Sequence, residues 1–270
     1  MKLVFLFTTI LFASLSTAAH TAEQIRMAVT TSFHNSGLAD ILLPQIAADL
    51  DLDVQLLVVG TGQALRLGRA GDVDAILVHS RSAEEAFVAD GAGTHRREIM
   101  YNDFVVVGPT EDPAEVATAK TATEALQKIA GMEIPFVSRG DDSGTHKMEL
   151  ALWQSAGLDV ARFDRWYRAV GAGMGAALTA ATGMHAYILT DRASWLNYNN
   201  KQGLTQLFAG DPILFNQYAF LPVNPERHPH VRADLVAQLE GWLTSDTAAK
   251  LINAYQIKGE SLFVFNAKPR

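Results

Sequence analysis

Residues 136–146 read FVSRGDDSGTH and show a pattern that recurs along the chain. Apolar residues at 134–137 are typical of a strand, the polar residues after them are typical of a turn, and a helical pattern then continues to Gly157. Ser143 suits the N-cap of this helix, because its hydroxyl can accept a hydrogen bond from a free backbone N–H of the first turn. The stretch therefore predicts a strand, a loop and a helix in succession.

The start of this predicted helix has the features of an anion site. Its unpaired N–H groups and the positive end of the helix dipole both attract negative charge, and Arg139 adds a planar set of donors. A surface explanation stays open for this loop by itself, since Ser-Gly-Thr is also an ordinary helix cap and Arg139 can pair with Asp141 or Asp142 at little energetic consequence. If an anion binds, half of its site comprises Ser138, Arg139, Ser143, Gly144 and Thr145.

Two other strand ends offer a matching half-site. Alternating apolar residues at 25–29 predict a strand that ends in the hydroxyl residues 30–32, and a helical pattern follows from Leu38. A hydroxyl can donate to an anion without adding charge. The apolar run at 54–59 predicts a buried parallel strand that ends in Gly-Thr-Gly at 60–62. This triplet lacks the lysine of a P-loop and the third glycine of a dinucleotide fingerprint, so we do not interpret it as a nucleotide site.

The strand–loop–helix order recurs and predicts an α/β fold with a mostly parallel sheet, whose strand ends line a crevice. Two long extended runs, 97–109 and 218–225, interrupt this order and end at or near proline. As hinge strands they would divide the chain into two lobes, each a mostly parallel sheet flanked by helices. Lobe one would comprise 23–108 plus 220–270, and lobe two 109–219. We expect the glycine-rich segment 171–178 to pack a helix on a strand rather than to bind a ligand.

The N-terminal residues 1–22 are typical of a secretory signal peptide, with an early Lys2, an apolar run at 3–13 and small residues at 16–19. The apolar run is too short for a stable membrane anchor, so we expect an exported, periplasmic protein.

The 270 residues contain no cysteine, so no disulfide supports the fold. A formal net charge of −7 argues against binding to nucleic acid or anionic membranes. We further expect a monomer without a metal or other cofactor.

At several positions the chain resembles the tungstate-binding, substrate-capturing components of bacterial ABC importers, which are type II periplasmic binding proteins. The stretch SRGDDSGTHK is the most specific part of this resemblance, and the similarity covers nearly the whole mature chain. The segments that carry it are 30–32 with 36–38, 59–65, 101–105, 138–147 and 189–192.

The resemblance implies a two-lobed protein that holds an oxyanion in its cleft and delivers it to a membrane permease. By position, it assigns the binding roles to Thr31, Ser32, Thr61, Arg139, Ser143, Gly144 and Thr145. The chain departs from the family pattern at two places. Residues 33–35 stand where an acidic residue often precedes Ser-Gly-Leu, and Ser80-Arg81 follows His79 where aspartate is expected, which adds a possible cation near a strand end.

The identity of the anion follows in part from proton chemistry. A site made only of donors favours the fully ionised dianions tungstate, molybdate and sulfate, because a protonated phosphate needs an acceptor for its own O–H. If Asp141 or Asp142 points inward, phosphate becomes a candidate again. Tungstate and molybdate are too alike in size and charge for the sequence to separate them.

A secreted serine hydrolase is the alternative of another class, with Ser143 as nucleophile and His146 as base. The Gly-x-Ser-x-Gly elbow is absent around Ser143, and no third orienting group is indicated. His228 and His230 could bind a metal, but two ligands without a third are more typical of a surface loop. The sequence therefore favours a binding protein over an enzyme.

Overall fold

The computed structural model describes residues 23–268, so the predicted signal peptide at 1–22 lies outside the described residues. The main sheet comprises ten strands. They are β1 (Glu23–Thr30), β2 (Leu52–Val59), β3 (Ala75–Val78), β4 (Arg97–Pro109), β5 (Phe136–Ser138), β6 (Tyr167–Ala169), β7 (Tyr187–Asp191), β8 (Leu204–Phe208), β9 (Phe215–Pro222) and β12 (Val264–Phe265). The principal order is β2-β1-β3-β9-β4-β7-β5-β6, and β8 and β12 also pair with β4. A separate two-stranded sheet joins β10 (Gln256–Ile257) to β11 (Glu260–Ser261).

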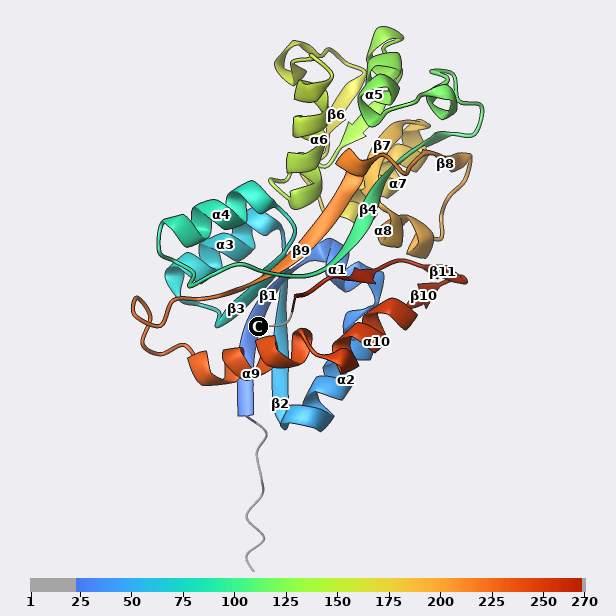
Figure 1. Cartoon of the computed structure of the whole chain (residues 1–270). Coiled ribbons are helices and arrows are strands. Elements are labelled where there is room, and N and C mark those ends of the chain that lie inside the picture. Colours follow the sequence, from blue (N-terminus) through green and yellow to red (C-terminus); the bar gives the residue numbers. More distant parts are fainter. Residues whose placement is uncertain (1–22, 269–270) are drawn as a thin grey trace, which may run out of the picture.

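Helices flank this sheet on both sides (Figure 1). They are α1 (Thr31–Ser36), α2 (Ala39–Leu50), α3 (Thr61–Ala70), α4 (Arg81–Ala89), α5 (Ala122–Gly131), α6 (Gly144–Ser155), α7 (Met174–Met184), α8 (Arg192–Asn197), α9 (Ala233–Leu243) and α10 (Asp246–Ala254). Three short 3-10 turns lie at Val116–Thr118, Val160–Arg162 and Pro212–Leu214. Within residues 23–268, no helix combines the length and the apolar character that crossing a membrane requires.

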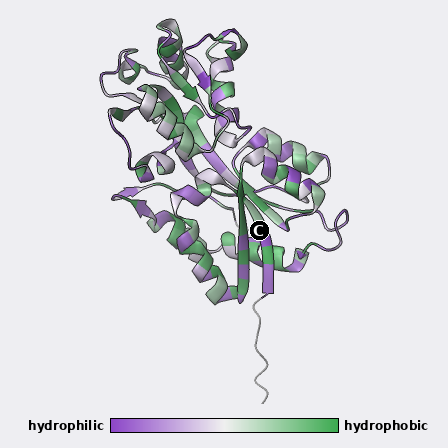
Figure 2. Cartoon of the chain, turned by 180° about the vertical axis from the view of Figure 1, so that it is seen from behind, coloured by the Kyte–Doolittle hydropathy of each residue, from purple (hydrophilic) through white to green (hydrophobic). Residues whose placement is uncertain are grey.

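Lobe one is organised by β1, which pairs in parallel with β2 on one side and β3 on the other. Successive side chains of a strand point to opposite faces, so β1 contributes to two cores. Ile25 and Val29 pack with residues of α2 and α9, whereas Ala28 packs on the other face with residues of α3 and α4. Figure 2 shows hydrophobic runs along the central strands, while the surrounding helices carry both hydrophobic and hydrophilic residues.

Lobe two repeats the arrangement around β5, which pairs in parallel with β6 and β7. Lobe two also has a hydrophobic core on each face of its sheet, and successive residues of β4 contribute to one core and then the other. Phe104 and Val106 pack with residues of α5 and α6, and Val105 and Val107 pack with residues of α7. The predicted α/β fold, with strands mostly parallel within each lobe and flanked by helices, is therefore confirmed; every antiparallel pair of the main sheet involves β4 or β9.

Two long strands connect the lobes, and both match extended runs predicted from the sequence. Strand β4 pairs with β9 over residues 97–103 and then with β7 over residues 104–107. Strand β9 pairs with β3 as well as with β4. Figure 1 shows β4 and β9 running side by side from one lobe into the other. The predicted lobe borders, 108/109 and 219/220, fall inside these two strands.

Candidate functional site

Two helix starts from different lobes meet at the centre of the molecule. The backbone N–H of Gly144, the first residue of α6, donates to the Oγ1 of Thr61, the first residue of α3, at 3.1 Å. Thr61 is fully buried. Ser143 caps α6, as the sequence predicted, because its Oγ accepts a hydrogen bond from the His146 N–H at 3.1 Å. Two positive helix ends therefore lie at one point, which favours a negative ligand there.

Arg139 supplies the positive side chain of this region. Its side chain is only 2% exposed, and its Nη2 donates to the Thr31 Oγ1 of lobe one at 3.3 Å and to the Asp141 Oδ2 at 2.5 Å. The other Asp141 oxygen accepts from the Ser143 N–H at 3.3 Å. Asp141 therefore holds both the guanidinium and the loop in place. This carboxylate points inward, which was one of the two orientations that the sequence left open.

The end of β1 joins the site through a buried serine. Ser32 is fully buried, and its Oγ forms hydrogen bonds with the Thr30 Oγ1 at 3.1 Å and the His79 Nε2 at 3.0 Å. His79 directly follows β3, so two neighbouring strand ends contribute to this cluster. Burial, reinforced by the nearby positive charge of Arg139, lowers the pKa of His79 to about 3. The imidazole is therefore neutral at physiological pH, and Arg139 is the cation beside it.

Buried polar atoms without a hydrogen-bond partner concentrate around these residues. Native proteins pair almost all buried polar groups, because an unpaired one costs about 1–3 kcal/mol. Among the described residues the unpaired atoms include the His79 Nδ1, Ser138 Oγ, Arg139 Nε, Thr145 Oγ1, Asp191 Oδ2 and Tyr218 OH. Such a concentration is expected where side chains are arranged for a polar ligand rather than for one another.

Asp191 adds a buried acidic group close to Arg139. It caps α8 with its Oδ1, which accepts from the Ser194 N–H at 2.8 Å, as the sequence predicted. Burial raises the pKa of Asp191, and the positive charge of Arg139 partly opposes this shift. The other oxygen, Oδ2, is buried without a hydrogen-bond partner among the described residues, so it is available to a polar ligand.

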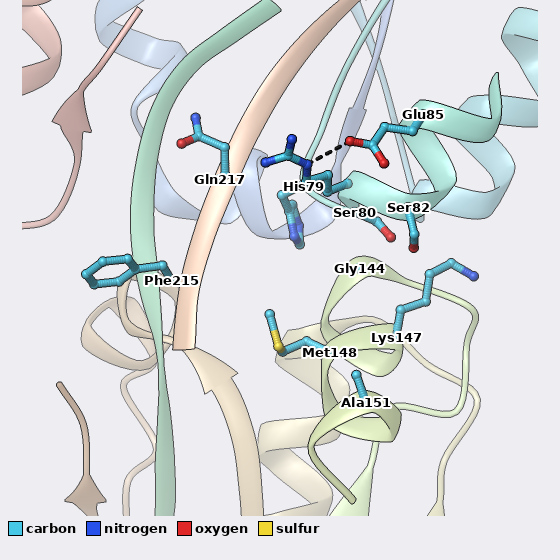
Figure 3. Close-up of a pocket in the computed structure, with 11 residues that line it drawn as sticks. His79, Ser80, Ser82, Glu85, Gly144, Lys147, Met148, Ala151, Phe215 and Gln217 are labelled. Carbon is cyan, nitrogen blue, oxygen red and sulfur yellow. Dashed lines mark hydrogen bonds and ion pairs between the residues drawn. The ribbon is translucent and has the colours of Figure 1, made fainter. Parts of the chain in front are cut away.

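A cavity of about 460 Å³ adjoins the meeting point of the lobes. Figure 3 shows His79, Ser80 and Ser82 on the lobe-one side and Gly144, Lys147 and Met148 on the α6 side. The lining includes His79 and Gly144 but none of the other six predicted site residues, so the cavity borders the centre of the site on the flank of the hinge strands.

All seven residues predicted for the site lie in this region. Thr31, Ser32 and Thr61 come from lobe one, and Arg139, Ser143, Gly144 and Thr145 come from lobe two. Direct hydrogen bonds link Thr31 to Arg139 and Thr61 to Gly144 across the lobes. Their role as ligands stays a prediction.

The sequence analysis missed several neighbours of these seven residues. His79 could have been found, because it follows a buried strand just as Thr31 and Gly60 do. The glycine-rich segment expected only to pack also reaches the site, since a β-carbon on Gly173 would lie 3.9 Å from the Thr31 Oγ1. Asp191 gave only the signal of a helix cap.

Two further sequence-based expectations concern Arg81 and the pair of Ser143 and His146. The Arg81 side chain is 71% exposed and pairs with Glu85 at 2.7 Å, so the possible extra cation is a surface residue. The His146 Nδ1 accepts from the Asp142 N–H at 3.2 Å, whereas the Ser143 Oγ accepts from the backbone of His146. The described contacts therefore contain no bond between the Ser143 hydroxyl and the His146 ring of the kind that a nucleophile and its base require.

Comparison with known proteins identifies the family. A family model described as a PBP superfamily domain matches residues 16–247. The tungstate-binding protein TupA of Peptoclostridium acidaminophilum is 42% identical over 247 residues, which span 90% of this chain and 86% of that protein. The solved tungstate-binding protein TupA from Desulfovibrio alaskensis G20 is 43% identical, with a TM-score of 0.80, and the match covers 92% of this chain and 100% of that one.

A second solved structure agrees with these matches. The crystal structure of the tungstate ABC transporter from Geobacter sulfurreducens is 47% identical, with a TM-score of 0.81, and the match covers 87% of this chain and 100% of that one. Sequence and fold thus point to the same group. The chain therefore belongs to the PBP superfamily and, within it, to the family of the tungstate-binding proteins of ABC transporters.

Proposed function

We propose that this protein captures a tetrahedral oxyanion dianion, tungstate in particular, between its lobes and delivers it to the permease of an ABC importer. The observation that carries the proposal is the direct contact between the starts of α3 and α6, made by Gly144 N–H and Thr61 Oγ1, with buried Arg139 beside it. The relatives named tungstate-binding proteins support tungstate as the anion.

The donors of the proposed site suit an anion that carries no proton. Hydroxyl, guanidinium and backbone N–H groups all offer hydrogens, and the ligand-binding residues we propose are Thr31, Ser32, Thr61, Arg139, Ser143, Gly144 and Thr145. Both oxygens of Asp141 already accept hydrogen bonds from Arg139 and Ser143. Asp142 is 57% exposed and pairs with Lys147. Asp142 is thus engaged at the surface, whereas the inward-pointing Asp141 keeps a second lone pair on each oxygen, which leaves phosphate as a candidate beside tungstate, molybdate and sulfate.

Asp191 also has a buried oxygen, Oδ2, without a hydrogen-bond partner among the described residues, so a possible acceptor for the O–H of a protonated phosphate lies close to Arg139. Molybdate, sulfate and phosphate are therefore the competitors against which tungstate must be measured.

Calorimetric titration of the mature protein with tungstate, molybdate, sulfate and phosphate tests the proposal, together with melting temperatures at a saturating concentration of each anion. We expect tungstate to bind most tightly and to raise the melting temperature, because a ligand that binds only the folded state stabilises it. Arg139→Ala should abolish this rise. Arg162→Ala, which removes an exposed arginine paired with Asp159, is the matched control and should bind as the wild type does. An undiminished tungstate shift in Arg139→Ala would remove Arg139 from the site.

We further propose that the lobes 23–108 plus 220–270 and 109–219 open and close about β4 and β9. Strand β4 pairs with β9 over residues 97–103 and with β7 of lobe two over residues 104–107, and β9 returns the chain from lobe two to pair with β3 of lobe one, so both connections between the lobes run through these strands. Small-angle scattering with and without tungstate should show a smaller radius of gyration in the presence of the anion; an identical radius at full occupancy would contradict closure.

The remaining expectations concern the protein in the cell. We propose export through the signal peptide 1–22 to the periplasm, and action as a monomer that meets the permease. Cell fractionation and mass measurement in solution by light scattering test these two points. Hydrolysis of phosphate or acyl esters that is lost in Ser143→Ala would instead favour the enzyme alternative.

A further inference from the structure

We propose that Asn197 of α8 is a positioning residue: its side-chain amide bonds lobe two to the C-terminal end of α1 and so holds the lobes together around the anion. The inference rests on the proposed function, because the closed arrangement serves binding only if a ligand is held between the lobes. Asn197 lies outside the predicted site and acts through α1.

Helix α1 of lobe one is bonded to lobe two at both of its ends. At its start, the Thr31 Oγ1 accepts from the Arg139 Nη2 at 3.3 Å, within the proposed site. At its end, the Asn197 Nδ2 donates to the backbone oxygens of Asn35 at 2.7 Å and Ser36 at 3.1 Å. Because α1 has only six residues, bonds at its end also restrain the residues at its start.

The end of α1 needs donors from outside the helix, since the last carbonyl oxygens of a helix have no partner within it. The Phe33 oxygen accepts from the Ser36 hydroxyl at 2.6 Å. The His34 oxygen accepts from the Gly37 N–H at 3.1 Å. The next two oxygens, those of Asn35 and Ser36, have no backbone donor among the described residues. Side chains or water must therefore satisfy them.

The chemistry of these two acceptors fixes the orientation of the Asn197 amide. Backbone oxygens can only accept, and an asparagine side chain carries both of its donor protons on Nδ2. One proton serves each oxygen, so the donor capacity of the amide is used entirely on α1. A hydroxyl has one proton and a carboxylate has none. An amide at position 197 thus satisfies both oxygens at once, which neither of those groups can do.

Helix α8 is anchored in lobe two and reaches across to lobe one. Trp195 packs in a lobe-two core with residues of α7, and the Tyr198 OH lies 3.1 Å from the Thr182 Oγ1 of α7. On the opposite side, Ala193 packs in the lobe-one core that includes residues of α1. Figure 1 shows α8 on the side of lobe two that faces lobe one. Asn197 therefore adds directional bonds to an apolar contact between the lobes.

Tyr255 provides a matched comparison within lobe one. Its hydroxyl donates to the Ser36 oxygen at 2.6 Å, so the same oxygen receives one bond from its own lobe and one from Asn197 of the other lobe. Opening the lobes breaks the Asn197 bond and leaves the Tyr255 bond in place. The first bond should therefore influence how tightly the anion is held, and the second should influence the stability of lobe one.

Calorimetry and stopped-flow measurement of tungstate release test the role of Asn197. Asn197→Ala should weaken tungstate binding by about 3- to 30-fold, because one or two hydrogen bonds of the closed arrangement are exchanged for bonds to water. The rate constant of release should rise by a similar factor, since the lobes open more readily. The amide has no proton left for the anion, so molybdate should lose affinity by the same factor as tungstate. A changed ratio between the two anions would overturn the proposal.

Two further variants separate the bond from charge and from stability. Asn197→Asp should bind tungstate more weakly than Asn197→Ala, because a carboxylate repels the two backbone oxygens. Asn199→Asp adds the same charge on an exposed residue nearby and should bind as the wild type does. Tyr255→Phe should lower the ligand-free melting temperature and leave the release rate unchanged, whereas Asn197→Ala should do the reverse. A release rate in Asn197→Ala equal to that of the wild type would refute the role of Asn197.

Spin labels measure the separation of the lobes directly, and the absence of cysteine from the chain makes their placement specific. Arg162→Cys in lobe two and Lys250→Cys in lobe one provide two exposed positions for pulsed EPR distances. Adding Asn197→Ala to this labelled protein should populate longer distances, both without ligand and at the same tungstate concentration.

These measurements keep the two proposals apart. If the wild type does not bind tungstate, the proposed function fails, and the ligand-free distances decide the role of Asn197: identical distributions with and without Asn197→Ala overturn it. If the wild type binds tungstate but Asn197→Ala binds and releases it equally well, the role of Asn197 fails and the proposed function stands.

Discussion

Gly144 of lobe two lies so close to His79 of lobe one that no side chain fits between them. A β-carbon on Gly144 would lie 2.6 Å from both the Cε1 and Nδ1 atoms of His79 and 3.2 Å from its carbonyl oxygen. The histidine is buried and cannot easily move away, because its ring is packed against Tyr218. Glycine at position 144 is thus required for the approach of the two lobes in this structure.

Gly144→Ala should therefore weaken tungstate binding at least about tenfold, or about 1.4 kcal/mol, as measured by calorimetry. The added methyl group clashes only across the lobes, so a slight opening relieves it and the ligand-free melting temperature should change little. Gly241→Ala is the control: it adds the same atom on α9, where no neighbour lies within 4 Å. Wild-type affinity in Gly144→Ala would show that the lobes need not approach this closely to hold the anion.

Thr145→Val should lower tungstate affinity without lowering the stability of the ligand-free protein. The Thr145 Oγ1 is buried and has no hydrogen-bond partner, so an isosteric methyl group removes an unpaired polar atom. Thr182→Val provides the contrast. The Thr182 Oγ1 donates to backbone carbonyls of lobe two, so its loss should destabilise the fold by about 1–2 kcal/mol and leave binding unchanged.

Chemical denaturation and calorimetry of both threonine variants check this contrast. Equal destabilisation by the two substitutions would mean that Thr145 serves the fold rather than the ligand.

Asp141→Asn should lower the melting temperature of the ligand-free protein and enlarge the rise that tungstate produces. The substitution leaves the buried Arg139 without its carboxylate partner, at a cost on the order of 1–3 kcal/mol, and a bound dianion can replace the missing charge. Asp142→Asn is a suitable control, since Asp142 is 57% exposed and its left-handed φ of 57° suits asparagine. Melting curves at several tungstate concentrations measure the effect, and a smaller rise in Asp141→Asn than in the wild type would refute the argument.

The buried Glu149 should make the free energy of unfolding depend on pH. This residue of α6 accepts hydrogen bonds from the Trp153 Nε1 and the Tyr167 OH, and burial raises its pKa from 4.5 to about 7. Because the folded state holds the proton more tightly than the unfolded chain, the resulting stability is complete below about pH 4.5 and is lost as the pH rises through 7.

Glu149→Gln removes this titration and keeps an acceptor oxygen for both donors. The free energy of unfolding should therefore fall less between pH 5 and pH 8 in the variant than in the wild type, with a difference of at most about 3 kcal/mol. Burial raises the pKa of Glu84 in the same direction, but that residue is present in both proteins and its contribution cancels. Parallel pH profiles measured by denaturant titration would contradict the predicted pKa shift of Glu149.

The local elements were predictable because their signals lie within a few residues of one another. The alternation of apolar residues at 25–29 marked β1, the continuous apolar run before Gly60 marked β2, and the hydroxyl of Ser143 marked the start of α6. Each of these signals depends on strand periodicity or on the unpaired N–H groups of a helix start, which neighbouring residues satisfy. The same local rule found the polar groups at strand ends and helix starts, and the resemblance to the tungstate-binding proteins then assigned binding roles to seven residues among them.

Only the packing of the two lobes decided which groups these residues meet. The Arg139 bond to Thr31 joins residues 108 positions apart, and the Gly144 bond to Thr61 spans 83 positions. His79 and Asp191 gave no strong signal, since their importance comes from burial beside Arg139 and from partners on other strands. The sequence by itself thus determined the helix starts, strand ends and donors, because these depend on local geometry. The tertiary structure decided their convergence, the neutral state of His79 and the need for glycine at 144, because burial and contact exist only once the lobes are packed.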